Sequence, residues 1–169
     1  MAKQYDARPA MALDAGKKYS ATIELAKGGI FVADLFPDVA PETVNSFVFL
    51  AQDGYYDGIT FHRVILDFMA QGGDPTGTGT GGPGYNVPDE VNDNKHTEGT
   101  LSMAKTAAPD SAGSQFFVCL ADVSHLDGQY SVFGRVREGL EVIHTIRERD
   151  PGSDSEAGDA IKTITISVE

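Results

Sequence analysis

The sequence predicts a mostly β protein, folded as a closed antiparallel barrel with two helices. Three observations support this prediction. Short segments with an apolar residue at every second position recur along the 169-residue chain, as in half-buried strands. Only two segments show the three- to four-residue apolar spacing of a helix. Strands and helices do not alternate regularly, so a parallel sheet of βαβ units is not expected.

A hairpin is expected first. Apolar and polar residues alternate from Tyr19 to Leu25, which is strand spacing. Lys27-Gly28-Gly29 then supplies glycines for the positive φ angles of a tight turn, and Ile30–Phe36 forms the returning strand. Pro37 ends this strand.

A helix should follow the hairpin. Pro41 suits its first turn, because a proline there lacks only an N–H that would be unpaired anyway. The helix is expected to run to about Gln52, with Gly54 beyond its end. A second helix is expected over about Glu138–Arg147.

The other strands are short. Residues 1–15 read as a loosely held arm and residues 16–169 as one domain, since no linker or internal repeat divides them. The acidic stretch Asp150–Asp159 reads as a loop. The remaining expected strands are Ile59–Ile65, Phe68–Gln71, Leu101–Ala104, Gln115–Leu120, Ser131–Val136 and a last one whose Ile164, Ile166 and Val168 share a face.

Composition excludes several classes of protein. Thirteen Lys and Arg against 25 Asp and Glu give a net charge of −12, and without a basic cluster no nucleic-acid binding is expected. No apolar run approaches the roughly 20 residues that span a bilayer, so no membrane association is expected. Cys119 is the one cysteine, so nothing argues for an oxidising compartment. The expected location is cytoplasmic.

The glycine-rich segment Gly77–Gly84 matches the GxGxxG pattern of dinucleotide sites. Such a site needs the loop to open a helix whose N-terminal amides hold the pyrophosphate. Pro83 and Pro88 prevent a helix from following, so the segment is expected to be a surface loop.

Metal and hydrolase chemistry find no support. The four histidines, His62, His96, His125 and His144, form no HExxH pair, and a single cysteine makes no CxxC site. There is no GxSxG elbow for a nucleophilic serine. No metal site is expected, and His144 is expected to be a surface imidazole.

A candidate site does appear where polar residues interrupt apolar strand faces. Alternation places Arg63 on one face with Phe61 and Ile65. Such polar groups either pair with one another or with backbone, or they line a ligand pocket, because a buried unpaired one costs about 1–3 kcal/mol. Two further strands show the same mixture, in the pairs Met69 with Gln71 and Gln115 with Phe117.

Several segments, taken together, resemble the cyclophilins in order and spacing, over roughly residues 17–168. The resemblance implies the closed eight-stranded barrel of that family, capped by two helices, with the active groove on its outer face. The segments are Phe61–Ile65 (FHRVI), Phe68–Asp74 (FMAQGGD), Gly113–Phe117 (GSQFF), Leu126–Gly128 (LDG) and Val132–Val136 (VFGRV).

The resemblance implies a peptidyl-prolyl cis–trans isomerase (rotamase), with Arg63, Gln71 and Phe117 as catalytic residues. No cofactor is required, because no bond is made or broken. The implied partners are proline-containing peptides and unfolded or folding proteins. The protein is expected to be a monomer and to assist folding as a chaperone. The implied substrate-binding residues are Phe68, Met69, Ala104, Lys105, Gln115, Leu126, His125 and Tyr130.

Three of these positions depart from the commonest cyclophilin pattern. His125 stands where the best-known members carry tryptophan, Tyr130 where they carry histidine, and Lys105 where asparagine is frequent. The family binds the cyclic peptide cyclosporin, to which the tryptophan indole donates. Weak cyclosporin binding is therefore expected here, with the reaction class unchanged.

An X–Pro bond rotates over a barrier of roughly 18–20 kcal/mol, so the enzyme must hold the twisted amide better than either planar form. Arg63 would donate to the proline nitrogen as it regains a lone pair, with Gln71 and Gln115 orienting Arg63. The proline ring of the substrate would sit among Phe68, Met69, Phe117 and Leu126.

Two alternatives come from other classes of protein. A peptide-binding module could keep the groove without turnover, although a pure binder has no need of the Arg63 donor. A purely structural barrel would leave the apolar cluster exposed without purpose.

Overall fold

One antiparallel sheet organises residues 2–169, the part of the chain that the computed structural model describes. Its strand order is β3-β4-β6-β5-β7-β2-β1-β8. Beside it lie helices α1 (Pro41–Gln52) and α2 (Leu140–Ile143) and a 3₁₀ turn, η1 (Ser124–Leu126). The strands are β1 (Tyr19–Leu25), β2 (Ile30–Leu35), β3 (Arg63–Ile65), β4 (Met69–Gly72), β5 (Thr100–Met103), β6 (Phe116–Cys119), β7 (Val132–Glu138) and β8 (Ile161–Val168).

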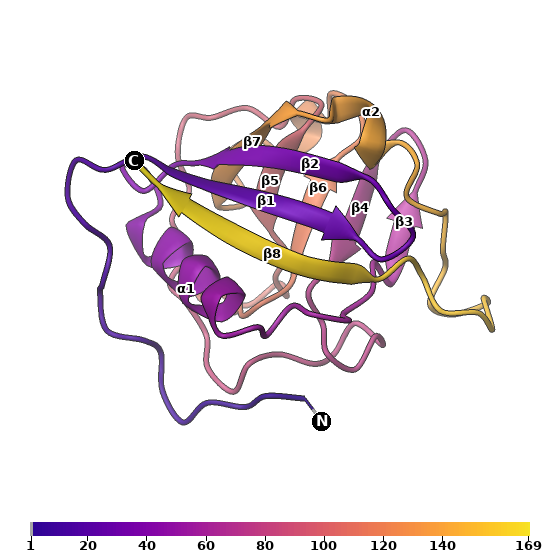
Figure 1. The fold of residues 1–169 in the computed structure, drawn as a ribbon, viewed down its shortest axis with the longest axis horizontal. Coiled ribbons are helices and arrows are strands. Elements are labelled where there is room, and N and C mark those ends of the chain that lie inside the picture. The colour runs from indigo at the N-terminus through magenta and orange to yellow at the C-terminus, as the bar shows by residue number, and fades with distance from the viewer. Residues whose placement is uncertain (1) are drawn as a thin grey trace.

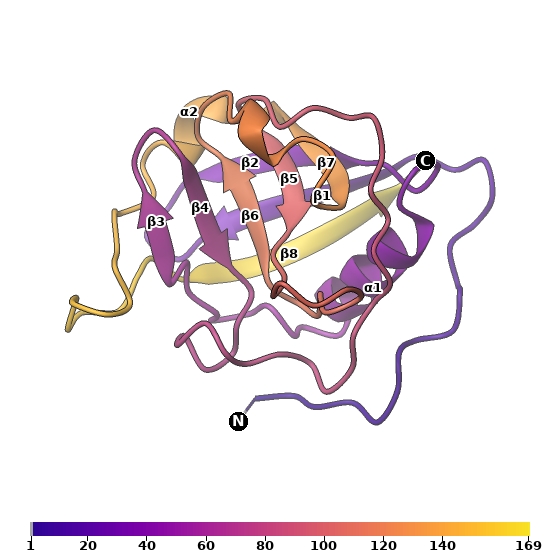
Figure 2. The same cartoon turned by 180° about the vertical axis from the view of Figure 1, so that it is seen from behind.

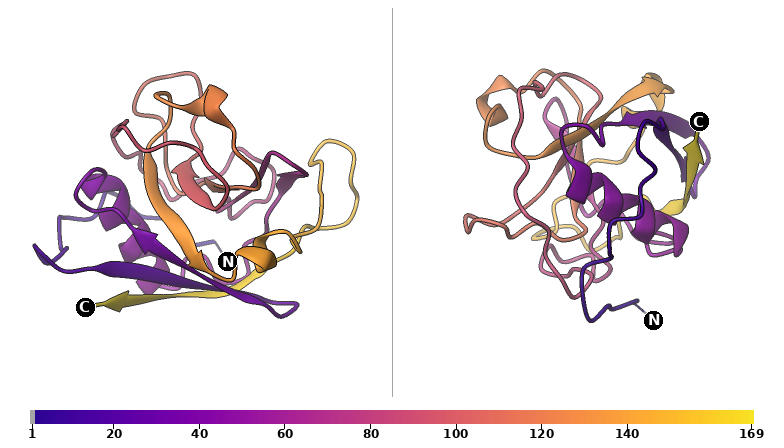
Figure 3. Two further views of the ribbon diagram at one scale, coloured as in Figure 1. Left: turned by 90° about the horizontal axis from the view of Figure 1, so that it is seen from above. Right: turned by 90° about the vertical axis from the view of Figure 1, so that its left-hand side faces the viewer.

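The sheet curls into a half-barrel. Figure 1 shows β2, β1 and β8 side by side across one wall. The view from behind shows β3, β4, β6 and β5 across the other wall (Figure 2). Seen from above, the two walls face each other, and α1 covers one side of the space between them (Figure 3). The mostly β fold with eight antiparallel strands is confirmed.

The predicted closure of the barrel is wrong, because the sheet is open between β3 and β8. A single bridge, Thr60 to Ala160, joins the segments before these strands, and no ladder connects the strands themselves within residues 2–169. The outer edge of β3 is occupied instead by Arg149. Val64 N donates to Arg149 O (2.9 Å), and Arg149 N donates to Val64 O (3.1 Å). The segment before β8 thus takes the place that β8 would need.

Local signals predicted the first elements well. The hairpin turn has Gly28 and Gly29 at φ angles of 102° and 105°, where side chains are disfavoured, and Leu25 N donates to Gly29 O (3.0 Å). Helix α1 has the predicted bounds. The second helix is shorter than predicted, because β7 extends to Glu138. Gly139, which has a left-handed backbone conformation (φ 78°), separates β7 from α2.

Aromatic rings fill the inner face of the sheet. Phe116, from β6, meets Phe47 of α1 edge-to-face with ring centroids 5.6 Å apart, and meets Tyr56 at the same distance. Phe61 was expected beside Arg63, but it is fully buried in this core, 6.1 Å from Phe116. The strand begins only at Arg63, so its alternation does not extend back to Phe61.

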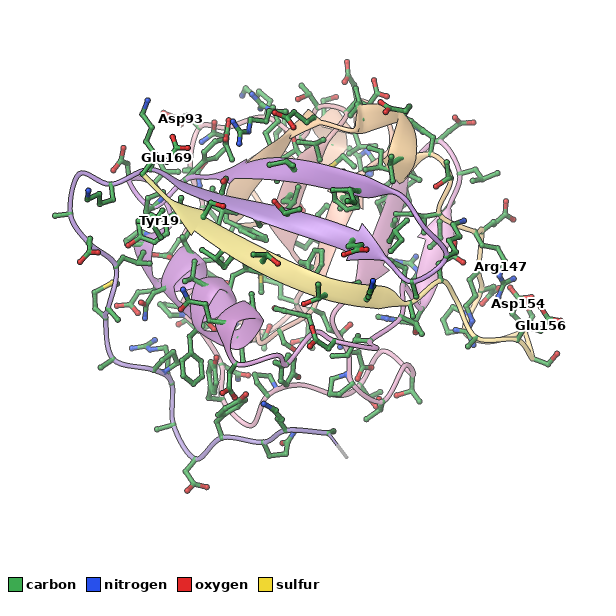
Figure 4. All side chains as sticks on the ribbon, in the orientation of Figure 1. Tyr19, Asp93, Arg147, Asp154, Glu156 and Glu169 are labelled. Carbon is green, nitrogen blue, oxygen red and sulfur yellow. The ribbon has the colours of Figure 1, made fainter. Side chains whose placement is uncertain are left out.

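Three segments outside the sheet matter for the site. Residues 2–15 form no helix or strand and run along the outside of α1 (Figures 1 and 3). The predicted surface loop at Gly77–Gly84 contains no helix. The predicted loop Asp150–Asp159 before β8 stands out from the sheet and carries Asp154 and Glu156, with Arg147 just ahead of it in the chain (Figure 4). None of the helices in residues 2–169 has the length and apolar character to span a membrane.

Candidate active site

A second, smaller apolar cluster lies on the outer face of the sheet. Its buried members are Met69, Phe117, Cys119 and Val123. Strand alternation produces this arrangement, since neighbouring residues of β6 point to opposite faces. Partly buried side chains surround the cluster, namely Phe68, Ala104, Leu126 and Tyr130.

Strand register places polar residues beside this cluster. Arg63 of β3 lies opposite Gln71 of β4, and Gln71 lies opposite Phe117 of β6. Directly opposed residues of antiparallel strands share a face and lie side by side. Three residues from three strands therefore form one row across the outer face, with the arginine at its end.

A pocket of about 340 Å³ opens over this row. Its walls also include His62, Thr78, Gly79 and Pro151. Nine of the predicted site residues line it: Arg63, Phe68, Met69, Gln71, Ala104, Lys105, Phe117, Leu126 and Tyr130.

The two glutamines bind each other. Gln71 Nε2 donates to Gln115 Oε1 (3.0 Å), and Gln115 Nε2 donates to the carbonyl oxygens of Gly79 and Gly81 (3.0 Å each). Both glutamines were expected to orient Arg63 and the peptide backbone; the hydrogen bonds that their side chains make within residues 2–169 go to each other and to the pocket wall. Within residues 2–169, the exposed guanidinium of Arg63 makes no hydrogen bond or ion pair, so its donors are free for a ligand.

A buried histidine supports Phe117 from behind. The ring of His96 stacks on that of Phe117 with centroids 5.9 Å apart and an interplanar angle of 15°. Its Nδ1 lies 3.0 Å from Asp127 Oδ1, and its Nε2 lies 3.0 Å from Ser102 Oγ. The backbone N–H of His96 also donates to Asp127, which lowers the pKa of that carboxyl. Phe117 is therefore held between a fixed imidazole and Tyr130, whose ring is 5.8 Å away.

Two predicted residues lie outside the pocket lining. His125 is exposed and sits beside Phe68, with ring centroids 5.7 Å apart. Gln115 lines a second pocket of about 510 Å³, which adjoins the first one along Gln71 and Ala104. The site is thus a groove with two pockets, and His125 lies at its edge.

Sequence reasoning missed four residues of the first pocket, namely His62, Thr78, Gly79 and Pro151. His62 had been considered only as a metal ligand, yet its ring, although buried, lines the pocket. Burial lowers the pKa of His62, which favours the neutral form of the ring. Pro151 comes from the loop before β8, which Arg149 holds against β3 through a hydrogen bond from Nη1 to His62 O (2.8 Å). No local pattern in the sequence indicates this long-range contact.

Cys119 is buried beneath the first pocket and is not part of its lining. Burial raises the pKa of its thiol to about 12. In residues 2–169, no group of three or more His, Cys, Asp or Glu side chains is arranged to hold a metal ion.

The half-barrel and its arginine-rimmed apolar pocket define the class of protein: a β-sheet protein with a ligand groove on its outer face. Residues 20–168 match the family described as "Cyclophilin type peptidyl-prolyl cis-trans isomerase/CLD". The chain belongs to the cyclophilin family, and its enzymatic activity is that of a peptidyl-prolyl cis–trans isomerase.

Known proteins agree in sequence and in structure. A peptidyl-prolyl cis-trans isomerase of Synechococcus elongatus is 53% identical over 132 residues, which are 77% of this chain and 90% of that one. One from Helicobacter pylori is 52% identical over 134 residues, which are 77% of this chain and 81% of that one. The crystal structure of a Cryptosporidium parvum cyclophilin has a TM-score of 0.79 at 32% identity, covering 89% of this chain and 98% of that chain. The resemblance inferred from the motifs is confirmed.

Proposed function

We propose that this protein accelerates X–Pro rotation by holding the twisted amide between Arg63 and the apolar pocket. One observation carries the proposal: Arg63 stands at the rim of an apolar pocket with no partner among residues 2–169. The uncatalysed rotation takes about 10–100 s at 25 °C, because it destroys amide resonance. Neither a nucleophile nor a cofactor is needed for it.

The apolar pocket would seat the proline ring. Met69 and Phe117 form its buried floor, while Phe68 and Leu126 are partly exposed at its sides. Burial of an apolar ring there is favourable by roughly 25 cal/mol per Å² of area removed from water. The Cryptosporidium parvum cyclophilin was also crystallised in the presence of the dipeptide Ala-Pro, and that structure has a TM-score of 0.77 with this one. This supports a proline-containing peptide as the ligand.

Arg63 would supply the transition-state selectivity. In the planar amide the proline nitrogen shares its lone pair with the carbonyl, so it accepts no hydrogen bond. When the amide twists, the lone pair returns to the nitrogen, and a guanidinium N–H can donate to it. Because only the twisted amide offers this acceptor, the interaction lowers the barrier rather than tightening ground-state binding. Gln71 would contact the peptide backbone from the fixed wall that it shares with Gln115.

The substrates would be exposed X–Pro segments of peptides and of unfolded or folding proteins. Assistance to protein folding, a cytoplasmic location and a monomeric state stay predictions from the sequence.

Two-dimensional NMR exchange spectroscopy on a proline peptide tests the proposal, because it measures both binding and the cis–trans exchange rate. The wild type should speed exchange, and Arg63→Ala should slow the catalysed rate by about 10²–10³. Peptide affinity should change much less, because the apolar pocket is intact. Arg63→Lys is the matched control for charge, and it should recover only part of the rate, since an ammonium presents its donors differently.

Circular dichroism checks that both variants fold. A folded Arg63→Ala protein with wild-type exchange rates would refute the mechanism. A wild type that binds the peptide without speeding exchange would identify a binding module instead.

A further inference from the structure

The N-terminal arm reaches the second pocket of the groove. Tyr5 N donates to Pro83 O (2.8 Å), and Gln4 Nε2 donates to Gly82 O (2.7 Å). At Gly84, where φ is +98°, an added Cβ would come within 2.5 Å of Tyr5 O. The arm therefore packs directly on the backbone of the 82–84 loop, at a position where only glycine leaves room.

Tyr5 fixes the arm in this place. Its ring meets Phe49 of α1 edge-to-face with centroids 5.2 Å apart, and its hydroxyl donates to Asp53 Oδ2 (2.6 Å). The hydrogen bond from Tyr5 lowers the pKa of the Asp53 carboxyl, and Lys3 forms an ion pair with the same group (3.4 Å). Further along the arm, the buried side chain of Asn45 bonds to the backbone of residues 9–12. The arm is thus anchored at two separate points of α1.

Gln4 lines the second pocket from this anchored position. The same pocket is also lined by Gln71, Ala104, Lys105 and Gln115, of which Gln71, Ala104 and Lys105 line the first pocket as well. A peptide whose proline occupies the first pocket would therefore place a neighbouring side chain in the second. The residues that match the cyclophilin family begin at 20, so Gln4 adds to the groove from outside the matched part.

We infer that Gln4 determines which substrate side chain the second pocket accepts, and that this pocket selects a polar side chain near the proline. The inference rests on the proposed function. Gln4 uses its amide nitrogen on Gly82 O and Lys3 O, whereas its Oε1 accepts no hydrogen bond within residues 2–169. Lys105 Nζ forms a long ion pair with Asp89 Oδ2 (3.9 Å), a distance at which its N–H groups make no hydrogen bond to that carboxylate. The pocket thus offers a free acceptor and an ammonium, which suit an amide or hydroxyl side chain.

Peptides that differ at one position test this inference. Each has one proline in an alanine background, and Asn, Asp or Lys replaces one alanine at a time on either side. The wild type should turn over one Asn peptide about two- to fivefold faster than the all-alanine peptide, and Gln4→Ala should remove that preference. With the substitution at the same peptide position, Gln4→Glu should turn over the Lys peptide about two- to fivefold faster than the all-alanine peptide, and Gln4→Lys should do the same with the Asp peptide. Both preferences should be smaller at high salt.

Arg8→Glu is the matched control, because Arg8 lies in the same arm but pairs with Glu42 away from the groove. Arg8→Glu should turn over every peptide at the wild-type rate, and for each Gln4 variant the rate with each substituted peptide is compared with that variant's own rate with the all-alanine peptide. Three results would overturn the inference while leaving the isomerase activity intact. The Gln4 variants could keep the wild-type preference among the peptides, or change the rate equally for every peptide. The third result is that Arg8→Glu changes the preference in the same way as the Gln4 variants. A wild type that accelerates none of the peptides would instead overturn the proposed function, and the inference with it.

Discussion

The two faces of the sheet are built from the same strands but differ in what surrounds them. On the inner face, Phe116 is enclosed by other rings on several sides. On the outer face, Phe117 has a ring behind it and beside it but a pocket in front. The comparison shows that one strand, through the alternation of its side chains, contributes both to a closed core and to an open apolar binding surface. Changes on the inner face should alter stability, and changes on the outer face should alter activity.

The strongest test of this comparison is Phe116→Ala. Removing a fully buried ring leaves a cavity and should lower the free energy of unfolding by about 3–5 kcal/mol. Urea denaturation measures this loss, with Phe116→Leu as the milder control. Turnover per folded molecule should stay close to wild type, the reverse of Arg63→Ala. An unchanged unfolding free energy, or a folded but inactive Phe116 variant, would break the separation between the faces.

The edge of the outer face offers the next largest effect. His125 is exposed beside Phe68 and presents a smaller ring than a tryptophan would. His125→Trp should tighten cyclosporin binding by about 1–3 kcal/mol, through added apolar contact and an indole hydrogen bond. Calorimetric titration compares the two proteins, and His144→Trp serves as a control because that exposed imidazole lies elsewhere, paired with Glu98. Equal affinities for wild type and His125→Trp would disprove this prediction.

The carboxyl group of Asp74 should make the stability of the protein depend on pH. Burial acts to raise the pKa of its carboxyl, but hydrogen bonds from Thr76, Gly81 and Gly79 outweigh burial, and the net effect is a lowered pKa. Because the pKa is lower in the folded state, Asp74 adds stability above its unfolded pKa of about 3.9, and that stability is lost as the pH falls through the folded value.

Asp74→Asn should therefore cost about 1–2 kcal/mol at pH 7 and nearly nothing at the acid end of the range where the protein still folds. Urea unfolding at a series of pH values measures the difference, and the exposed Asp93→Asn is the control. A difference that does not depend on pH would show that the shape of the Asp74 side chain matters rather than its charge.

The smallest effect is expected at Cys119, which faces outward from β6 but lies beneath the pocket. Cys119→Ser should keep most of its turnover and lose about 1 kcal/mol of stability, because a buried hydroxyl replaces an apolar thiol. With its pKa raised to about 12, the thiol of the folded protein should resist alkylation at pH 8 and react only after unfolding. Rapid alkylation of the folded protein, or loss of turnover in a folded serine variant, would contradict this prediction.

Sequence reasoning succeeded where the signal was local. Pro41 and the apolar spacing after it predicted the correct bounds of α1, and alternation placed Met69 and Gln71 on one face, which is the outer face of the sheet. It failed where distant segments compete for one place. The pairing of Val64 with Arg149 keeps the barrel open, and the entry of Gln4 into the groove depends on how Tyr5 packs on α1. Such contacts leave no period or motif in the chain.

The pairing of β1 has a consequence for the newly made chain. β1 is hydrogen-bonded to β2 on one side and to β8 on the other. Its second partner emerges only after residues 26–160 have been synthesised, which takes roughly 7–27 s at about 5–20 residues per second. For that time one edge of β1 is unpaired, with its backbone groups open to pairing with another chain. A chain that ends before Ile161 would contain all the groove residues, but its first strand, β1, would lack its second partner, β8.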